Sequence, residues 1–354
     1  MTARRLAFAT TGTPRPPVPG LRTHLFEDMF ARRYDESLLD PIPTATGVRR
    51  VPSWFKLARE IRRRQDEYDA VVSWSEGATV ALMTLDGIRR SRRPHIAMMY
   101  WFSRPFVRLP LRAFGDRLQA IVTWSSVQRE YVIRELGMPS EKVYFIRHYV
   151  EQAFWSPRDG ETDMICSAGA EMRDYPTLIE ALRGTDLRCH IATDHVRTSR
   201  RMGFGARVHA DDVTAGAGDN VTIGRKGPHD LRDLYARSRF VVVPLHPSDT
   251  DNGVTVILEA MAMGKPVICS RTQGQVDVIQ DGVTGIFVPV GDPAALRRAM
   301  LDLWNDPERA KEMGRAGRAY IERHHTLDDF CAKAKTAIDA SLDGRPARPD
   351  GSFD

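Results

Sequence analysis

The sequence lacks the features that mark several protein classes. Its four cysteines, at positions 166, 189, 269 and 331, lie far apart and form no C-x-x-C pair. This argues against a disulfide framework and a zinc site, and it fits a reducing compartment. No apolar run approaches the roughly 20 residues that a membrane-spanning helix needs, and the N-terminus has too few apolar residues for a secretory signal. We therefore expect a cytoplasmic protein.

Lysine is also scarce, and charge is unevenly distributed. Only seven of the 51 basic residues are lysine, and the formal net charge is +5. Residues 1–150 carry 25 basic and 15 acidic side chains, a balance of +10, whereas the remainder carries 26 and 31, a balance of −5. The uneven charge therefore argues against a uniformly basic nucleic-acid binder. It is consistent with a basic N-terminal domain beside an acidic C-terminal domain.

Short β-branched runs alternate with longer amphipathic stretches, which is typical of parallel strands joined by crossover helices. The 354 residues exceed the ~250–300 at which a single core usually divides. The sequence therefore predicts an α/β protein with two doubly wound, Rossmann-like domains facing a central cleft. We expect the first domain at 1–150, completed by a helix at 326–342, the second at 151–325, and a flexible tail at 343–354. The other predicted helices are Trp54–Arg64, Ser126–Leu136, Tyr175–Leu182, Asp230–Ser238, Val254–Met263, Pro293–Asn305 and Pro307–Arg323.

The segment from Phe240 to Phe287 is the most informative part of the chain. A buried strand ends at Pro244, a polar loop follows, and a helix begins near Val254. The unpaired N–H groups and the dipole of a helix N-terminus behind a glycine-containing loop favour a phosphate group. Asp251 lies in that loop and Glu259 about a turn into the helix, so both can face one ligand. Ionised carboxylates accept strong hydrogen bonds from neighbouring sugar hydroxyls.

This segment resembles the donor-site signature of retaining GT-B glycosyltransferases of family 4, also called group 1. The family pattern is E-x7-E, then AMAxGxPV, then a DGxxGxxV stretch. Here Asp251 and Glu259 form D-x7-E, residues 260–267 read AMAMGKPV, and residues 281–285 read DGVTG. The resemblance implies the GT-B fold and a nucleotide-sugar donor bound by the C-terminal domain.

The resemblance also implies roles for individual residues. Asp251 contacts the transferred sugar, and Glu259 holds the donor ribose. In the segment 166–182, Gly169 matches the family glycine and Arg173 takes the place of the basic residue on the leaving diphosphate, but Ala170 stands where a second arginine often lies. The remaining donor-site candidates are Asn252, the N–H groups of Gly253, Val254 and Thr255 on the diphosphate, and Arg225 and Lys226 on a phosphate or the base.

Residues 1–150 are expected to hold the acceptor, and they match the family less well. Candidates for the acceptor and sugar cleft are Gly20, Glu76, Tyr100, His148 and His246, each of which has an ordinary structural alternative. Arginine lies beside apolar residues in the segments 54–64, 89–94 and 104–112. These segments can lie on an anionic membrane and present a lipid-linked acceptor. They can equally pack their apolar faces on their own sheet.

We therefore expect sugar transfer with retention from a nucleotide diphosphate sugar to a small-molecule, lipid-linked or saccharide acceptor. UDP is the family default, and GDP comes next. No metal ion or organic cofactor is expected, although Asp249-Thr250-Asp251 also spells the D-x-D motif of metal-dependent transferases. Two alternatives remain, namely a nucleotide-sugar epimerase or hydrolase of similar form and a non-catalytic nucleotide-sugar-binding partner.

Overall fold

The computed structural model describes residues 4–10, 18–21, 53–88, 93–193, 195–197, 207–209 and 216–352. The chain forms two compact units. Unit 1 comprises Met1–Arg147 and Phe330–Asp354, and unit 2 comprises His148–Asp329. The sequence predicts these boundaries after residues 150 and 325.

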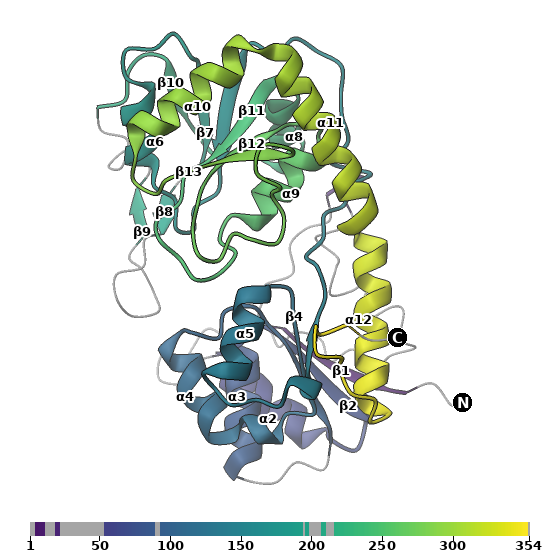
Figure 1. Cartoon of the computed structure of the whole chain (residues 1–354). Helices are drawn as coiled ribbons and strands as arrows, with labels where there is room; N and C mark the ends of the chain where they lie inside the picture. The colour runs from purple at the N-terminus through teal and green to yellow at the C-terminus, as the bar shows by residue number, and fades with distance from the viewer. Residues whose placement is uncertain are drawn as a thin grey trace. The chain divides into compact units, whose positions relative to one another are not determined.

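Unit 1 is built on a five-stranded parallel sheet whose described strands lie in chain order, β1-β2-β3-β4-β5 (Figure 1). The strands are β1 (Leu6–Thr10), β2 (Ala70–Trp74), β3 (His95–Met98), β4 (Ala120–Thr123) and β5 (Val143–Phe145). The helices are α2 (Ser53–Arg63), α3 (Glu76–Ile88), α4 (Pro105–Phe114), α5 (Ser126–Arg134) and α12 (Leu327–Leu342), whose first three residues belong to unit 2. Strand residues such as Val72 and Ile121 are fully buried, which explains why these runs are apolar.

Helices α3 and α4 are absent from the sequence prediction for physical reasons. In α3, residues 78–83 are all buried, so the helix shows no amphipathic period. Helix α4 carries Pro110 in its interior, which reads as a helix breaker in a sequence. Both helices follow strands directly, as crossover helices must in a parallel sheet.

Unit 2 is built on a six-stranded parallel sheet in the order β10-β7-β6-β11-β12-β13. The strands are β6 (Met164–Ala168), β7 (Cys189–Ala192), β10 (Val221–Ile223), β11 (Ser238–Val243), β12 (Val267–Ser270) and β13 (Gly285–Val288). A separate antiparallel pair, β8 (His195–Arg197) and β9 (Arg207–His209), stands out from this sheet (Figure 1). The helices are α6 (Tyr175–Leu182), α8 (Pro228–Arg237), α9 (Val254–Ala262), α10 (Pro293–Asn305) and α11 (Pro307–His324).

Aspartate caps explain where three helices of unit 2 begin. The side chain of Asp292 accepts a hydrogen bond from the Ala295 N–H at 2.8 Å, and Asp306 accepts one from the Arg309 N–H at 3.0 Å. Asp174 caps α6 in the same way. Each cap is followed by a proline in the first turn, where a missing N–H costs nothing.

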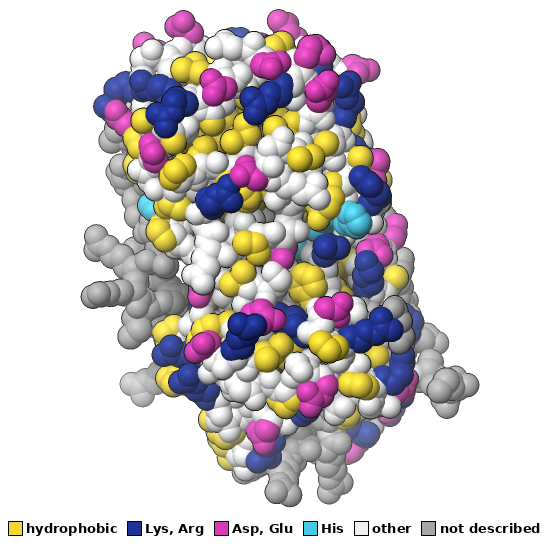
Figure 2. Space-filling view, viewed as in Figure 1, with side chains coloured by type: hydrophobic (Ala, Val, Ile, Leu, Met, Phe, Trp, Pro, Cys, Tyr) yellow, Lys and Arg dark blue, Asp and Glu magenta, His cyan; other side chains and the backbone are white. Residues whose placement is uncertain are grey.

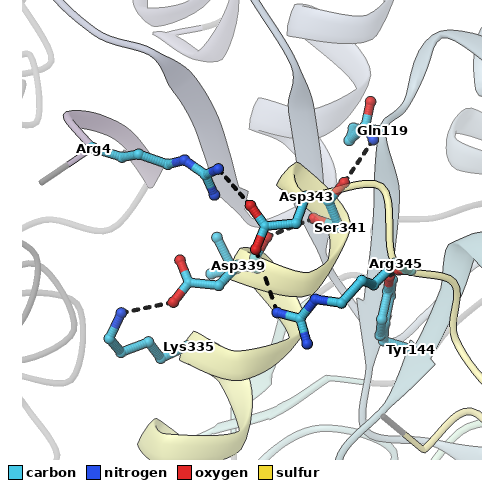
Figure 3. Close-up of polar contacts among 9 residues, drawn as sticks. Arg4, Gln119, Tyr144, Lys335, Asp339, Ser341, Asp343 and Arg345 are labelled. Atoms are coloured by element: carbon cyan, nitrogen blue, oxygen red, sulfur yellow. Dashed lines mark hydrogen bonds and ion pairs between the residues drawn. The ribbon is translucent and has the colours of Figure 1, made fainter. Parts of the chain in front are cut away.

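The C-terminal segment returns to unit 1 and packs against it. Figure 3 shows Arg4 paired with Asp343 and the Gln119 amide donating to the Ser341 carbonyl, the latter at 2.8 Å. The predicted flexible tail is therefore wrong for its described part, residues 343–352. There the Phe145 N–H donates to the Gly351 carbonyl at 3.0 Å, so the tail covers the free edge of β5.

The structure shows how the charged side chains and the cysteines are distributed. On the face in view in Figure 2, basic and acidic side chains are interspersed over both units. All four cysteines are buried free thiols. Among the described residues, no helix is both long and apolar enough to cross a membrane.

Candidate functional site

The sheet of unit 2 reverses its winding between β6 and β11. Open α/β sheets bind ligands at such a point, in the crevice beyond the carboxyl ends of the strands. Two segments meet there, residues 169–174 after β6 and residues 244–253 after β11. Their backbones pair through a bridge between Arg173 and Leu245. The fold thus brings the predicted Gly169, Arg173 and Asp251 segments to one edge of the sheet.

The turn after β6 has an unusual backbone. Met172 has φ 57°, the one positive value at a non-glycine position within the described ranges. Its carbonyl accepts a hydrogen bond from the His246 N–H at 2.9 Å, which helps to hold this strained conformation. Gly169 has φ 94°, and a Cβ there would lie 2.6 Å from Nη2 of Arg173. Glycine is therefore required for the guanidinium to lie where it does.

Arg173 is a buried cation that makes no ion pair with a carboxylate in the described ranges of the chain. The residue is only 3% exposed. Nε donates to the Ala168 carbonyl at 2.9 Å and Nη1 to the Glu171 carbonyl at 2.8 Å, while Nη2 makes no hydrogen bond to the part of the chain that the structure describes. Burying an unpaired charge is costly, so this arrangement favours an anionic ligand at the free face of the guanidinium.

Helix α9 points its N-terminus toward the same guanidinium. Gly253, which precedes the helix, has φ 89°, and a Cβ on it would lie 2.9 Å from Cγ1 of Val243 and 3.4 Å from Nη1 of Arg173. The Val254 N–H is already used, because it donates to the Asp251 carbonyl at 3.0 Å. This differs from the prediction that this N–H meets a phosphate.

Other N–H groups at this helix end remain available. Those of Gly253, Thr255 and Val256 have no hydrogen bond to any described residue. The first turn of α9 contains no acidic side chain that would oppose an anion. Val256, which the sequence prediction omits, therefore joins Gly253 and Thr255 as a donor for an anion.

Asp251 lies in this turn and is 3% exposed. The Thr250 hydroxyl donates to Oδ1 of Asp251 at 3.1 Å, whereas Oδ2 is buried and makes no hydrogen bond to the described residues. Burial, helped by the charges of Asp277 and Glu171, raises the pKa of Asp251 to about 7. A buried carboxylate oxygen without a partner suits a hydroxyl donor from a ligand.

Glu259 lies further along α9 and is held by a tyrosine. The hydroxyl of Tyr235, a fully buried residue of α8, donates to Oε2 of Glu259 at 3.0 Å. Burial raises the pKa of Glu259 to about 8 even though this hydrogen bond opposes the shift. Tyr235 is not predicted from the sequence, because nothing in the mixed polarity of α8 marks the residue that reaches α9.

Asn252 and Lys226 have neighbours that bear on their predicted roles. Asn252 is buried, and its Oδ1 accepts a hydrogen bond from the Ser248 hydroxyl at 2.5 Å. Lys226 lines a hollow of about 440 Å³ between α8 and strands β7 and β10, together with His190 and Asp230. Arg225 is exposed beside it. Arg225 and Lys226 thus follow β10 at its carboxyl end, while Asp219, Asp230 and Asp233 line the same hollow.

The two candidate histidines differ in their surroundings. Nδ1 of His246 lies 3.9 Å from a carboxylate oxygen of Asp174, beside the β6 turn. His148 instead stacks on Tyr149 with ring centroids 5.1 Å apart, and its carbonyl lies 2.7 Å from Nδ1 of His325. Burial lowers the pKa of His148 to about 4, so its ring is neutral at pH 7. Of the two, His246 is the one placed at the sheet edge beside Arg173.

In unit 1, Gly20 lies in an exposed turn with φ 77°, and Glu76 is the first residue of α3. Tyr100 stacks on Trp124 with ring centroids 5.4 Å apart, and Trp74 stacks on Trp124 at 4.9 Å. These rings follow β2, β3 and β4, so they lie at the carboxyl edge of this sheet. The two tryptophans were missed, because stacking between separate strands leaves no local sequence pattern.

The arginines of the basic N-terminal segments divide into two groups. On α2, Arg63 is paired with Glu60 at 2.6 Å, and Arg62 lies 3.5 Å from Asp86. On α4, Arg108 and Arg112 have no acidic partner within the described ranges. Both helices therefore carry basic side chains without an acidic partner in the described ranges, Lys56 and the exposed Arg59 on α2 and Arg108 and Arg112 on α4, while residues 89–92 of the third basic segment lie outside the described residues.

A metal site is not indicated by the side chains that the structure describes. Among these residues, no group of three or more His, Cys, Asp or Glu side chains is arranged to hold an ion. The Asp249-Thr250-Asp251 triplet in particular places Asp251 on the Thr250 hydroxyl and not on a second carboxylate.

Comparison with known proteins shows which sequences and folds this chain resembles. Residues 209–320 match the family model described as glycosyl transferases group 1. The chain is 34% identical over 146 residues to the D-rhamnosyltransferase WbpZ of Pseudomonas aeruginosa, a match over 40% of this chain and 35% of that protein. The chain thus aligns with about a third of the length of that relative.

A longer alignment and a solved structure extend the likeness to the whole chain. The chain is 26% identical over 347 residues to a GDP-mannose-dependent alpha-(1-6)-phosphatidylinositol monomannoside mannosyltransferase of Mycolicibacterium smegmatis, over 88% of this chain and 82% of that protein. Its fold resembles that of a sucrose-phosphate synthase from Thermosynechococcus elongatus with a TM-score of 0.75 and 14% identity, covering 96% and 100% of the two chains. The protein therefore has the GT-B fold. The family match within unit 2 and the relatives support a GT-B glycosyltransferase of group 1.

Proposed function

We propose that the protein transfers a sugar, with retention of anomeric configuration, from a nucleotide diphosphate sugar to an acceptor bound by unit 1. The observation that carries the proposal is the buried, unpaired guanidinium of Arg173 beside the N-terminus of α9. A cation and a helix end directed at one point form a site for a diphosphate. Asp251, with a buried carboxylate oxygen lacking a partner in the described residues, lies in the turn just before that helix.

Each group in this site has a distinct task. Arg173 and the N–H groups of Gly253, Thr255 and Val256 bind the diphosphate and stabilise the charge that grows on it as it leaves. Glu259, oriented by Tyr235, accepts hydrogen bonds from the ribose hydroxyls. The contacts to the diphosphate strengthen as the leaving group gains charge, which is why they accelerate the reaction rather than only bind the donor.

Asp251 binds a hydroxyl of the transferred sugar. In the reaction, the bond between the anomeric carbon and the diphosphate oxygen breaks, and the acceptor hydroxyl oxygen forms a bond to that carbon on the same face. The acceptor proton passes to the departing phosphate oxygen. The scheme includes no metal ion or cofactor, because Arg173 and the helix end supply the positive charge.

The donor is best sought first among GDP-sugars. The family resemblance alone favours a UDP-sugar, but the relative that aligns over 88% of this chain is named for GDP-mannose. A thermal-shift screen of GDP-, UDP-, TDP- and ADP-sugars identifies the donor, because a ligand at 100 times its Kd stabilises by about 2.7 kcal/mol. Product analysis with the best donor then separates transfer from hydrolysis or epimerisation, which release free sugar or an epimer without any acceptor.

The acceptor is proposed to be lipid-linked and presented at an anionic membrane. This is supported by α4, where Leu109 is 59% exposed and lies between Arg108 and Arg112, neither of which is ion-paired within the described ranges. Each such arginine contributes about 1 kcal/mol near an anionic surface. Sedimentation with vesicles of neutral and anionic lipid tests this, with Leu109→Ser expected to weaken binding to anionic vesicles. The control Val283→Ser, at a 52% exposed site of unit 2, leaves it unchanged.

A further inference from the structure

The segment that leaves β12 crosses the turn that carries Asp251. We propose that Gln275, in this segment, is a positioning residue that holds Asp251 in place by hydrogen bonding to the backbone of Asn252. The inference rests on the proposed function, since it concerns the residue assigned to the transferred sugar. It adds a residue that touches neither donor nor acceptor in that scheme.

The contact is short and buried. Gln275 is 3% exposed, and its Nε2 donates to the Asn252 carbonyl at 2.7 Å. Asn252 is the residue directly after Asp251, so this hydrogen bond fixes the turn immediately beyond the carboxylate. Burying a side-chain amide is unfavourable unless it is hydrogen-bonded, so the amide is held in this orientation.

A second contact fixes the other end of the same turn. The Gly274 N–H donates to the Ser248 carbonyl at 3.1 Å. A Cβ on Gly274 would lie 2.1 to 2.4 Å from the backbone O, C and N atoms of Thr250, which no side chain tolerates. The two backbones are therefore in direct contact, with glycine required at the crossing point.

Within the described residues, several hydrogen bonds of the Asp251 turn and its side chain are short-range, whereas those to Gly274 and Gln275 come from a segment more than 20 positions away. Within the turn, the Ser248 hydroxyl bonds Oδ1 of Asn252, and the Thr250 hydroxyl bonds Oδ1 of Asp251. Oδ2 of Asp251 is buried with no hydrogen-bond partner in the described residues. The direction of that oxygen is consequently set by the backbone of the turn, and Gln275 is the side chain that anchors this backbone from outside.

A double-mutant cycle tests whether Gln275 acts through Asp251. GDP-mannose and UDP-glucose are titrated against the wild type, Gln275→Ala, Asp251→Ala and the double variant, and GDP and UDP are titrated in parallel. Gln275→Ala is expected to weaken binding of the nucleotide sugar about tenfold, the effect of losing one buried hydrogen bond. Binding of the free nucleotide is expected to weaken less than binding of the nucleotide sugar, because the peptide unit that Gln275 holds supplies only one of the proposed diphosphate donors, the Gly253 N–H.

In the Asp251→Ala background, Gln275→Ala weakens binding of the nucleotide sugar no more than it weakens binding of the free nucleotide if the proposal is correct. A second loss of about tenfold there, or an equal loss of free-nucleotide affinity in the wild-type background, overturns it. If no nucleotide sugar of the GDP-, UDP-, TDP- and ADP-sugar screen binds the wild type, or if Asp251→Ala has no effect, the proposed function fails and this inference fails with it. The two failures are thereby distinguishable.

Hydrogen exchange provides a readout that needs no ligand. Gln275→Ala is expected to speed amide exchange in residues 248–253 while the core of α9 is unchanged. The matched control is Asn220→Ala, because the Asn220 side-chain amide also donates to backbone carbonyls in unit 2, those of Leu182, Thr185 and Leu187 at 3.0–3.3 Å. It lies at the amino end of β10, so it is expected to lower stability and leave both exchange in 248–253 and sugar binding unchanged. Unaltered exchange in Gln275→Ala contradicts the proposal.

Discussion

Replacing Glu259 with glutamine should stabilise the protein, increasingly so as the pH rises. Burial raises the pKa of Glu259 from 4.5 to about 8. Between these pH values the unfolded chain has released this proton and the folded protein retains it, so stability falls as the pH rises. A glutamine side chain at this position is uncharged in both states, and its amide oxygen still accepts the Tyr235 hydrogen bond. The loss of folding stability that the substitution removes is therefore absent near pH 4 and grows toward pH 8.

The magnitude follows from the shift. At 1.36 kcal/mol for each pKa unit, the difference between wild type and variant is about 1 kcal/mol at pH 5 and about 3 kcal/mol at pH 7. For a unit of this size, that corresponds to a gain of about 5–10 °C in Tm at pH 7. The assay is differential scanning calorimetry of the unit 2 transition at half-unit pH steps from 5 to 8.

The control for this experiment is Glu308→Gln on α11. Glu308 is exposed and paired with Lys311 at 2.8 Å, and that interaction lowers its pKa. Its replacement is expected to give no stabilisation at any pH. If Glu259→Gln melts at or below the wild-type temperature throughout, or if the difference in melting temperature does not widen with pH, then the pKa of Glu259 is not raised in the folded protein and the reasoning is refuted. A confirmed gain would show that the site sacrifices stability to keep an acidic side chain in place for the ligand.

Two further substitutions test the backbone around the site and the C-terminal packing. Gly253→Ala should destabilise unit 2 by about 1–3 kcal/mol, because φ is 89° at this position and the added Cβ lies 2.9 Å from Cγ1 of Val243. Urea unfolding measures the loss of stability, and an unchanged midpoint would contradict the prediction. Deleting residues 343–354 should destabilise unit 1, because it removes the tail that covers the edge of β5 and the hydrogen bonds that the Tyr144 hydroxyl and Arg129 make with the tail carbonyls. Limited proteolysis should then cut unit 1 sooner than unit 2, and equal resistance to cleavage would show that the tail is dispensable.

The sequence predicts the donor-side elements well because the signals there are local. A glycine that must adopt positive φ, an aspartate in a loop and an apolar helix lie within Val243–Ala262, and the structure has strand, turn and helix in that order. The order of the strands in the sheet could not be predicted from local signals. Parallel strands joined by crossover helices do imply, however, that the loops after the strands lie together at one edge of the sheet. Arg173 reaches that edge as the alternation of elements predicts.

The supporting contacts could not be predicted, because they join residues distant in the sequence. Tyr235 holds Glu259 across 24 positions and Gln275 holds Asn252 across 23, and neither has a periodicity or a spacing that marks it. The same holds for Trp74 and Trp124, which stack from different strands. Composition suggests a loose tail at 343–354, and only the backbone hydrogen bonds to β5 show that it is packed.

The central claim is that Arg173 and the N-terminus of α9 bind a diphosphate at the β6–β11 edge. Isothermal titration of GDP and UDP into the wild type and Arg173→Gln tests it most directly. Loss of the charge-assisted hydrogen bonds, worth about 1.5–3 kcal/mol, predicts a roughly 10- to 100-fold weaker Kd for the nucleotide that binds, with partial recovery in Arg173→Lys. An Arg173→Gln variant that remains folded and binds that nucleotide as tightly as the wild type would contradict the account.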